Sequence, residues 1–340
     1  MPSSAVNPMR KRPAQVGSRF WPAATLHSFR RQLLDWYDEN RRDLPWRGET
    51  DPYRVWISEV MLQQTRVAAV MAYYQRFVQR FPDVRSLAAA KPEAVLAAWS
   101  GLGYYRRARA LHHAAKVMVN EHRGELPRTV AQLRQLPGFG PYTAAAVASI
   151  AFAEPVAVVD GNVERVLSRL LAWPASKRDA PWETAQWLLA AERPGDFNQA
   201  MMELGATVCL PAQTQCARCP LFRWCRTRGL GPAKAKESRQ RRQLHYRLAR
   251  RREAVFLVQR GRGASLMPEM WELPELVVTG ARPEVTFRLR HSITVTDFAI
   301  EVSVGEPPPG VRGRWVKRAQ VEDLPLTGLT KKILRHANFI

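Results

Sequence analysis

The chain has 340 residues, which is enough for about two or three domains that each bury a core. Its 52 Lys and Arg against 30 Asp and Glu give a net charge of +22, which favours a polyanionic partner. Nucleic acid is the first candidate and an anionic membrane surface the second. No apolar run approaches the roughly 18 residues of a membrane-spanning helix.

Residues 1–22 carry the basic triplet Arg10-Lys11-Arg12 among Pro, Ser and Gly. A secretory signal needs an apolar segment, which this stretch lacks. We therefore expect a disordered basic arm, with a transit peptide as the alternative.

The spacing of apolar residues is helical through the first two-thirds of the chain. Asp51-Pro52 supplies an N-cap and a first-turn proline for one of these helices. An all-α region is therefore predicted, with helices over 26–37, 52–65, 67–80, a pair within 84–99, 108–121, one starting near Tyr142, 163–171, 182–191 and 197–205.

Glu59 lies on the second of these helices, in an apolar and amide-rich setting. Desolvation there would raise the pKa of its carboxyl group, which suits a general acid working near neutral pH. The alternative is a surface glutamate that the helix dipole stabilises.

Two glycine-flanked loops precede helices. Gly138 and Gly140 flank one residue before the helix that starts near Tyr142, and the amides of such a helix start can bind a DNA phosphate. A plain chain reversal would have the same pattern. In the other loop, Tyr104 and Tyr105 precede a basic helix, and they suit either base stacking or packing beneath the loop.

A second carboxylate, Asp160, follows an apolar run about twenty residues after the hairpin. In so basic a chain, this pairing of a phosphate-binding turn with a carboxylate indicates a nucleic-acid site.

The four cysteines of the chain are clustered between residues 209 and 225, which favours a metal or cluster site over a disulfide framework. Zinc modules usually show two close Cys pairs, and here only one pair is close. Four thiolates without histidine suit an iron–sulfur cluster better. The cysteines are Cys209, Cys216, Cys219 and Cys225.

Beyond a charged joint that extends to Arg252, the pattern becomes strand-like. A small α+β domain is predicted, with strands in 254–258, 276–278, 293–304 and 314–316 and a helix over 330–337.

Several long motifs, in this order, resemble the adenine DNA glycosylases of the MutY type, within the helix-hairpin-helix glycosylase superfamily. The resemblance covers about residues 26–334, and the motifs are SEVMLQQT at 58–65, GLGYYRRAR at 101–109, LPGFGPYTAAA at 136–146, VDGNVERV at 159–166 and FNQAMMELG at 197–205.

The resemblance implies a mainly α helix-hairpin-helix glycosylase region with an iron–sulfur module, followed by an α+β Nudix-like domain. The expected boundaries are 23–228 for the glycosylase region (a six-helix core of about 48–150 and a cluster module of 23–47 plus 151–228), 229–250 for a basic linker, and 251–340 for the Nudix-like domain.

The implied reaction is hydrolytic excision of adenine mispaired with 8-oxoguanine or guanine, after the base is flipped from the duplex. Glu59 matches the general acid, and Asp160 matches the carboxylate that stabilises the oxocarbenium-like sugar. The other matched positions are Tyr142 and Asn162 in support of these carboxylates, Arg47 and Gln199 at the adenine, Gln64, Thr65, Leu102, Tyr104, Gly138 and Gly140 at the DNA, and the four cysteines for one [4Fe-4S] cluster.

In the related endonuclease III type, the position of Tyr142 is a lysine that forms a Schiff base and cleaves the strand. A tyrosine cannot do so, and we expect a glycosylase without efficient lyase activity.

The C-terminal region resembles the module that recognises 8-oxoguanine, but it lacks the acidic box of Nudix hydrolases. Many members have a Phe-Ser-His loop where this chain has Ile293-Thr294-Val295. Candidate contacts to the opposite base are His291, Ser292 and Thr294.

Two other functions fit part of the pattern. A thymine–guanine mismatch glycosylase would share the cluster and the tyrosine, but such enzymes lack a Nudix-like extension. A non-catalytic iron–sulfur DNA-binding protein would not need both carboxylates. We expect a monomer that acts on double-stranded DNA in the bacterial cytoplasm, in the nucleoid, without binding a membrane.

Overall fold

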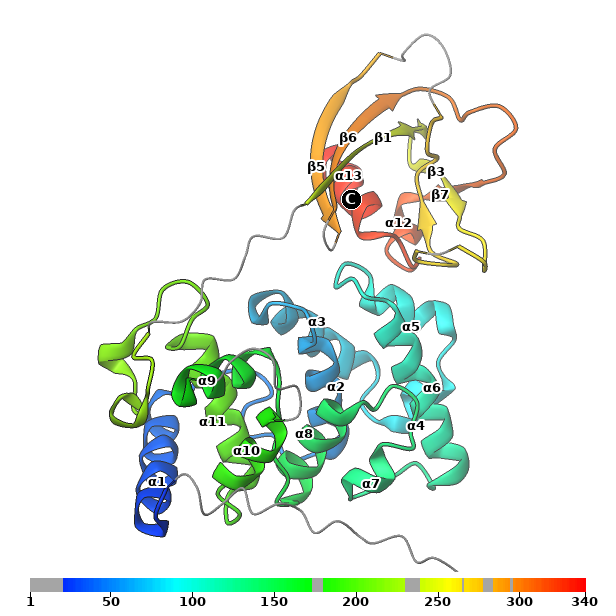
Figure 1. Cartoon of the computed structure of the whole chain (residues 1–340). Helices are drawn as coiled ribbons and strands as arrows, with labels where there is room; N and C mark the ends of the chain where they lie inside the picture. The colour runs from blue at the N-terminus through cyan, green and yellow to red at the C-terminus, as the bar shows by residue number, and fades with distance from the viewer. Residues whose placement is uncertain (1–20, 173–179, 230–238, 265, 278–283, 294–295) are drawn as a thin grey trace, which may run out of the picture. The chain divides into compact units, whose positions relative to one another are not determined.

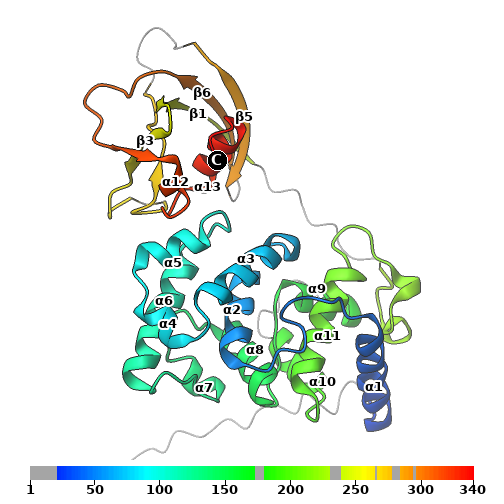
Figure 2. The ribbon, with the colours of Figure 1, turned by 180° about the vertical axis from the view of Figure 1, so that it is seen from behind.

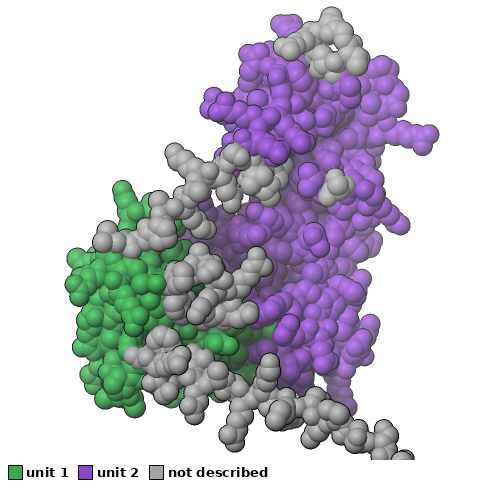
Figure 3. All heavy atoms as spheres, viewed as in Figure 1, with its two compact units in different colours: residues 1–43, 144–233 green, residues 44–143, 234–340 purple. Residues whose placement is uncertain are grey.

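The computed structural model describes residues 21–172, 180–229, 239–264, 266–277, 284–293 and 296–340. The chain divides into two compact units, coloured separately in Figure 3: unit 1 comprises residues 1–43 and 144–233, and unit 2 comprises residues 44–143 and 234–340. Thr294, Val278 and most of the expected N-terminal arm lie outside the described residues.

Unit 1 is helical in its described part, and α11 packs against both α1 and α9 (Figures 1 and 2). Buried aromatic and aliphatic side chains from these helices, among them Phe29, Leu167 and Phe197, form one core. The elements are α1 (Ala23–Asn40), α9 (Gly161–Leu171), α10 (Ala180–Leu188), α11 (Pro194–Thr207), η2 (Cys216–Arg218) and η3 (Phe222–Trp224), and the boundary between the units falls within α8 (Pro141–Phe152).

The first part of unit 2 is also helical, and α6 packs on α2, α4 and α5. The side chain of Asp51 accepts hydrogen bonds from the amides of Tyr53 and Arg54, and Pro52 occupies the first turn, which explains where α2 begins. The elements are α2 (Pro52–Leu62), α3 (Val67–Arg80), α4 (Val84–Ala89), α5 (Pro92–Trp99), α6 (Arg106–Glu121) and α7 (Val130–Leu133). The helices expected from apolar spacing are confirmed, except that the helix expected over 52–65 ends at Leu62 and the helix expected over 182–191 ends at Leu188.

The second part of unit 2 is the α+β region, in which α13 packs beside β4 over a core that includes Val255, Val302 and Ile333. One sheet has the order β1-β6-β5, with β1 parallel to β6, and in the other sheet β3 pairs with β2, β4 and β7. The elements are β1 (Gln240–Leu248), β2 (Arg250–Arg251), β3 (Ala254–Gln259), β4 (Trp271–Glu272), β5 (Phe287–Ile293), β6 (Thr296–Val304), β7 (Arg314–Lys317), α12 (Arg318–Val321) and α13 (Gly328–His336).

The expected linker 229–250 is wrong in its second half, because β1 occupies 240–248. Its charged residues alternate with Leu244, Tyr246 and Leu248, and pairing with β6 buries the last two of these. Residues 240–248, which were expected to be part of a charged linker, thus form an amphipathic strand.

Two further strand predictions need correction. Leu276 and Val277 lie in no strand, and the exposed fraction of Val277 is 83%. The expected strand 293–304 is the end of β5 followed by β6, which pair as antiparallel neighbours. In the described part of the chain, no helix is both long enough and apolar enough to cross a bilayer.

Candidate active site

Glu59 lies on α2 and is buried, with 5% of its surface exposed. The hydroxyl of Tyr142, at the start of α8, donates a hydrogen bond of 2.5 Å to its Oε2 atom. One turn further along α2, the Gln63 amide donates to Oγ1 of Thr143 across 2.8 Å. The start of α8 is therefore tied to α2 at the carboxyl group, and the alternative of a surface glutamate is wrong.

The hairpin before α8 depends on a close approach to α6. Gly138 has a φ of +78°, and a Cβ atom there would lie 2.6 Å from the Cβ of Ala110. Phe139 is buried and stacks on Trp56 of α2, with ring centroids 5.3 Å apart. Gly140 is exposed, and a Cβ atom there would meet nothing within 4 Å. Of the two hairpin glycines, packing thus requires a glycine at Gly138 but not at Gly140.

Asp160 is the N-cap of α9 in unit 1. Its Oδ1 accepts from the amides of Asn162 (2.9 Å) and Val163 (2.7 Å), and its Oδ2 accepts from the Asn162 side chain (2.9 Å). Three N–H donors therefore orient the carboxylate at the positive end of a helix.

Asn162 is itself fixed by two neighbours. Arg165 donates to its Oδ1 (2.8 Å) and to the carbonyl oxygens of Gly205 (2.8 Å) and Cys209 (2.9 Å). A Cβ atom on Gly205 would lie 2.6 Å from the Cβ of Asn162. The conformation of Asn162 thus depends on glycine at the facing position of α11.

Unit 1 contains two polar residues that the sequence analysis did not select. Asn198, on α11, is buried and holds the segment before Asp160: its Oδ1 accepts from the Val158 amide (3.0 Å) and its Nδ2 donates to the Val156 carbonyl (2.9 Å). Glu203 is buried and pairs with Arg42. Both lie on α11, which carries several polar residues, so residue type alone does not single them out.

The two predicted adenine contacts belong to different units of the chain. Gln199 is buried on α11 in unit 1, while Arg47 is half-buried in a turn of unit 2, where its amide donates to the Leu44 carbonyl (2.8 Å). Glu59 with Tyr142 belongs to unit 2, and Asp160 with Asn162 belongs to unit 1.

The loop residues proposed to touch DNA differ in exposure. Gln64 is exposed and Thr65 half-buried, whereas Leu102 is buried. Tyr104 is 43% exposed, but Tyr105 is buried and donates to the Leu326 carbonyl at 3.3 Å. Of the two tyrosines, Tyr105 packs under the loop and Tyr104 remains accessible.

The four cysteines line one cavity of about 30 Å³, together with Arg169. Arg169 approaches Sγ of Cys209 at 3.4 Å. Burial raises the pKa of the Cys219 thiol to about 11, so a metal that binds there must displace a proton. Among the described residues, no three His, Cys, Asp or Glu side chains form a group that could hold a metal ion.

Of the candidates for the opposite base, His291 is half-buried on β5, and burial lowers the pKa of its imidazole. Ser292 is exposed and donates to Oδ1 of Asp297 (2.6 Å). Thr294 lies outside the described residues.

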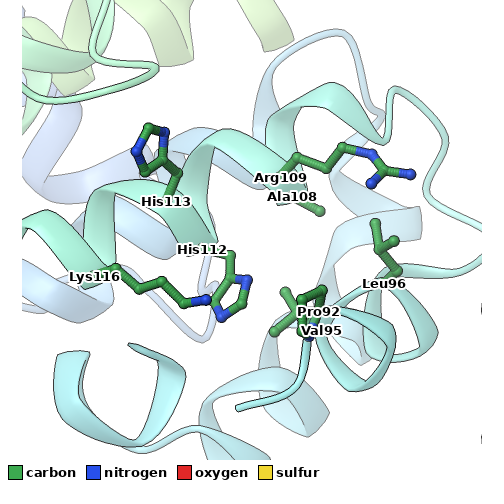
Figure 4. Close-up of a pocket in the computed structure, with 8 residues that line it drawn as sticks. All are labelled: Pro92, Val95, Leu96, Ala108, Arg109, His112, His113 and Lys116. Atoms are coloured by element: carbon green, nitrogen blue, oxygen red, sulfur yellow. The ribbon is translucent and has the colours of Figure 1, made fainter. Parts of the chain in front are cut away.

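A larger cavity, of about 380 Å³, lies between α5 and α6 and includes none of the predicted site residues (Figure 4). His112 is buried in its wall, beside Lys116. Burial, followed by the charge of Lys116, lowers the pKa of His112.

Residues 57–190 match the model of the HhH-GPD superfamily of base excision DNA repair proteins. An adenine DNA glycosylase of Rattus norvegicus is 50% identical over 230 residues, which cover 64% of this chain and 45% of that relative. The chain thus spans less than half the length of this relative.

Two solved structures are similar in fold. A thermostable thymine-DNA glycosylase matches with a TM-score of 0.56 and 29% identity, over 60% of this chain and 96% of that one. Endonuclease III, trapped as a covalent intermediate with DNA, matches with a TM-score of 0.54 and 24% identity, over 62% and 98%. The second likeness shows the fold alone.

Proposed function

We propose that this chain belongs to the MutY family of the HhH-GPD superfamily of base excision DNA repair proteins, and that it excises adenine from A:8-oxoguanine and A:G mispairs. The observation that carries the proposal is the buried Glu59 carboxyl group held by the Tyr142 hydroxyl at the start of α8.

Glu59 supplies the proton in this reaction. Adenine is a poor leaving group as an anion, and protonation at N7 lets it depart as a neutral base when the bond between C1′ and N9 breaks. The electron pair of that bond goes to the base, and the sugar is left as an oxocarbenium-like cation. The Tyr142 hydrogen bond fixes the carboxyl group in one orientation for this transfer.

Asp160 stabilises the cation, through a transient covalent bond to C1′ that water then hydrolyses with loss of a proton. Its three N–H donors hold it in place, so little reorganisation is needed as charge develops. Asn162 positions this carboxylate, and Arg47 and Gln199 bind the flipped adenine.

The reaction stops at the abasic site. Strand cleavage through a Schiff base needs an amine at the start of α8, where this chain has the phenol of Tyr142. The proposed activity is therefore that of a monofunctional glycosylase.

Cys209, Cys216, Cys219 and Cys225 would hold one [4Fe-4S] cluster. The fit rests on one cavity that is lined by all four thiols. Ligands of a four-iron cluster bind different iron atoms, so they stand further apart than the ligands of one ion. When bound, the cluster would cross-link residues 209–225 and support DNA binding.

The α+β region would act as a Nudix-like module that reads the base opposite adenine, through His291, Ser292 and Thr294. It offers a strongly basic sheet, in which Arg288 and Arg290 lie on β5 with His291. We propose that the protein acts as a monomer on double-stranded DNA in the bacterial cytoplasm, in the nucleoid.

A second candidate is excision of thymine from T:G mispairs, because the thymine-DNA glycosylase matches 60% of this chain at 29% identity. The match covers 96% of that structure but 60% of this chain, so part of this chain has no counterpart there. Adenine excision accounts for both parts of the chain.

The test is a single-turnover assay on otherwise identical duplexes that contain A:8-oxoguanine, A:G, T:G or A:T. We expect excision of adenine from the first two and none from A:T. A preference for T:G would overturn the proposal in favour of the second candidate.

A further inference from the structure

Arg107, the second residue of α6, caps the end of α2. Its Nη1 donates to the carbonyl oxygens of Val60 (2.7 Å), Met61 (2.9 Å) and Gln63 (2.5 Å). The carbonyls of Val60 and Met61 belong to the last turn of α2, which ends at Leu62, and Gln63 is the C-cap that follows it. Carbonyls at a helix end have no amide partner four residues on within the helix. One guanidinium from another helix satisfies them.

The same guanidinium also binds the loop before α6. Its Nη2 donates to Oγ1 of Thr65 (3.0 Å) and to the Gly103 carbonyl (3.4 Å). Its carbon atom Cζ lies 5.3 Å from the ring centroid of Tyr104 and 5.3 Å from that of Trp99. A single side chain thus connects two segments about 40 residues apart in sequence.

Each of these segments carries one exposed residue in the left-handed region. Gln64 has a φ of +57° and Tyr104 a φ of +50°. Such a conformation costs on the order of 1 kcal/mol or more for a residue other than glycine, and it persists only where neighbours impose it. Gln64 lies between two residues that bind Arg107, and Tyr104 follows a third.

We propose that Arg107 is a positioning residue that fixes the spacing between Gln64 and Tyr104, so that both enter the duplex together as the base leaves. The inference rests on the proposed function, since both residues are candidates for DNA wedges. A wedge that opens a base pair must be rigid, because a loose loop would yield to the stacked bases.

Lysine could not replace Arg107 in this role. The five acceptors lie around one planar group with donors in a fixed fork, whereas an ammonium has three donors on a flexible stem. Burial lowers the pKa of Arg107 to about 10, which still leaves it charged at neutral pH.

The test compares Arg107→Lys with wild type in the full-length protein. 2-Aminopurine beside the mispaired adenine reports base extrusion, and a duplex with an abasic-site analogue reports binding that needs no extrusion. We expect extrusion and single-turnover excision to fall by about tenfold or more. Affinity for the abasic duplex should change by less than about twofold, because no base pair must be opened. If Arg107→Lys gave the same extrusion signal as wild type, the inference would be overturned.

Double-mutant analysis separates positioning from general stability. In a Gln64→Ala, Tyr104→Ala background, Arg107→Lys should reduce extrusion no further, because the residues it positions are gone. An equal reduction in both backgrounds would show that Arg107 acts elsewhere. Arg85→Lys is the matched control, because Arg85 also donates to a backbone carbonyl, that of Arg123, and should behave as wild type.

If Arg107→Lys does not fold, Thr65→Val replaces it, because this change removes one acceptor and keeps the side-chain shape. Extrusion should then fall at an unchanged melting temperature, and an unchanged signal would overturn the inference. A wild-type protein that excises no adenine refutes the proposed function; normal excision by wild type and Arg107→Lys alike refutes this inference alone.

Discussion

The hydroxyl of Tyr142 donates a hydrogen bond to Oε2 of Glu59 across 2.5 Å, although the two residues are 83 positions apart. The contact joins the start of α8 to α2 within unit 2. It gives a buried carboxyl group a fixed orientation, and the predictions about chemistry depend on it.

Replacing Glu59 by glutamine should slow excision strongly and spare binding. Glutamine keeps the shape and can still accept from Tyr142, but it cannot supply a proton. General acid catalysis contributes about 10² to 10⁴-fold, so the single-turnover rate should fall within that range. Fluorescence anisotropy should give a Kd for the A:8-oxoguanine duplex close to that of wild type. Undiminished cleavage by Glu59→Gln would rule out this role.

The wild-type protein should release adenine without cutting the strand. Product duplexes should need alkali or heat to break, and borohydride should trap no protein–DNA adduct, because Tyr142 has no amine. Tyr142→Lys supplies the amine and provides the positive control for trapping. A strong adduct with the unmodified protein would contradict the proposed subclass.

Gly205→Ala should both destabilise the protein and slow excision. The new Cβ atom would lie 2.6 Å from the Cβ of Asn162, so one of the two must move. We expect a loss of about 1–3 kcal/mol in the free energy of unfolding, as for other overpacked sites. Urea titration checks the stability, and single-turnover assays check the displacement of Asn162 from Asp160. Gly161→Ala is the matched control, because a Cβ atom there meets nothing within 4 Å. Equal stability of the two variants would contradict the prediction.

The free energy of unfolding should fall as the pH drops below about 6.5, in part because of His112. Burial lowers the pKa of His112 in the folded state. At a pH below the pKa that His112 has in the unfolded chain, the unfolded chain takes up a proton before the folded protein does. The free energy of unfolding therefore decreases by at most about 1.4 kcal/mol per pH unit for this group. His291 shifts in the same direction and adds to the slope.

Urea titrations at about pH 7.5 and about pH 5.5 measure this dependence. His112→Asn should lose part of it, whereas His113→Asn should not, because His113 is exposed. An identical slope in wild type and His112→Asn would show that His112 is not the group responsible.

The purified protein should be brown, absorb in the visible range and contain roughly four iron atoms per chain. Cys216→Ser should lose iron and weaken DNA binding, since the cluster would cross-link residues 209–225. Stoichiometric zinc in place of iron would overturn the cluster assignment.

The local spacing of apolar residues predicts where most helices lie, and Asp51 is predicted as the residue that begins one of them. Asp51 and Asp160 are N-caps whose effect is local, since each accepts from amides two and three residues ahead. The motif around Glu59 and the position of Tyr142 could likewise be identified by residue type and order. Gly138 was predictable as a turn residue, because its positive φ is a property of a few neighbouring positions.

Features that depend on contacts between distant segments are visible in the folded protein alone. The tertiary structure buried Glu59 under Tyr142, separated the exposed Tyr104 from the packed Tyr105, and made the basic segment 240–248 a strand by pairing it with β6. It also gave Arg107 its five acceptors. Burial and hydrogen-bond partners are set by whichever segment folds against a residue, and composition and local spacing carry no information about that neighbour.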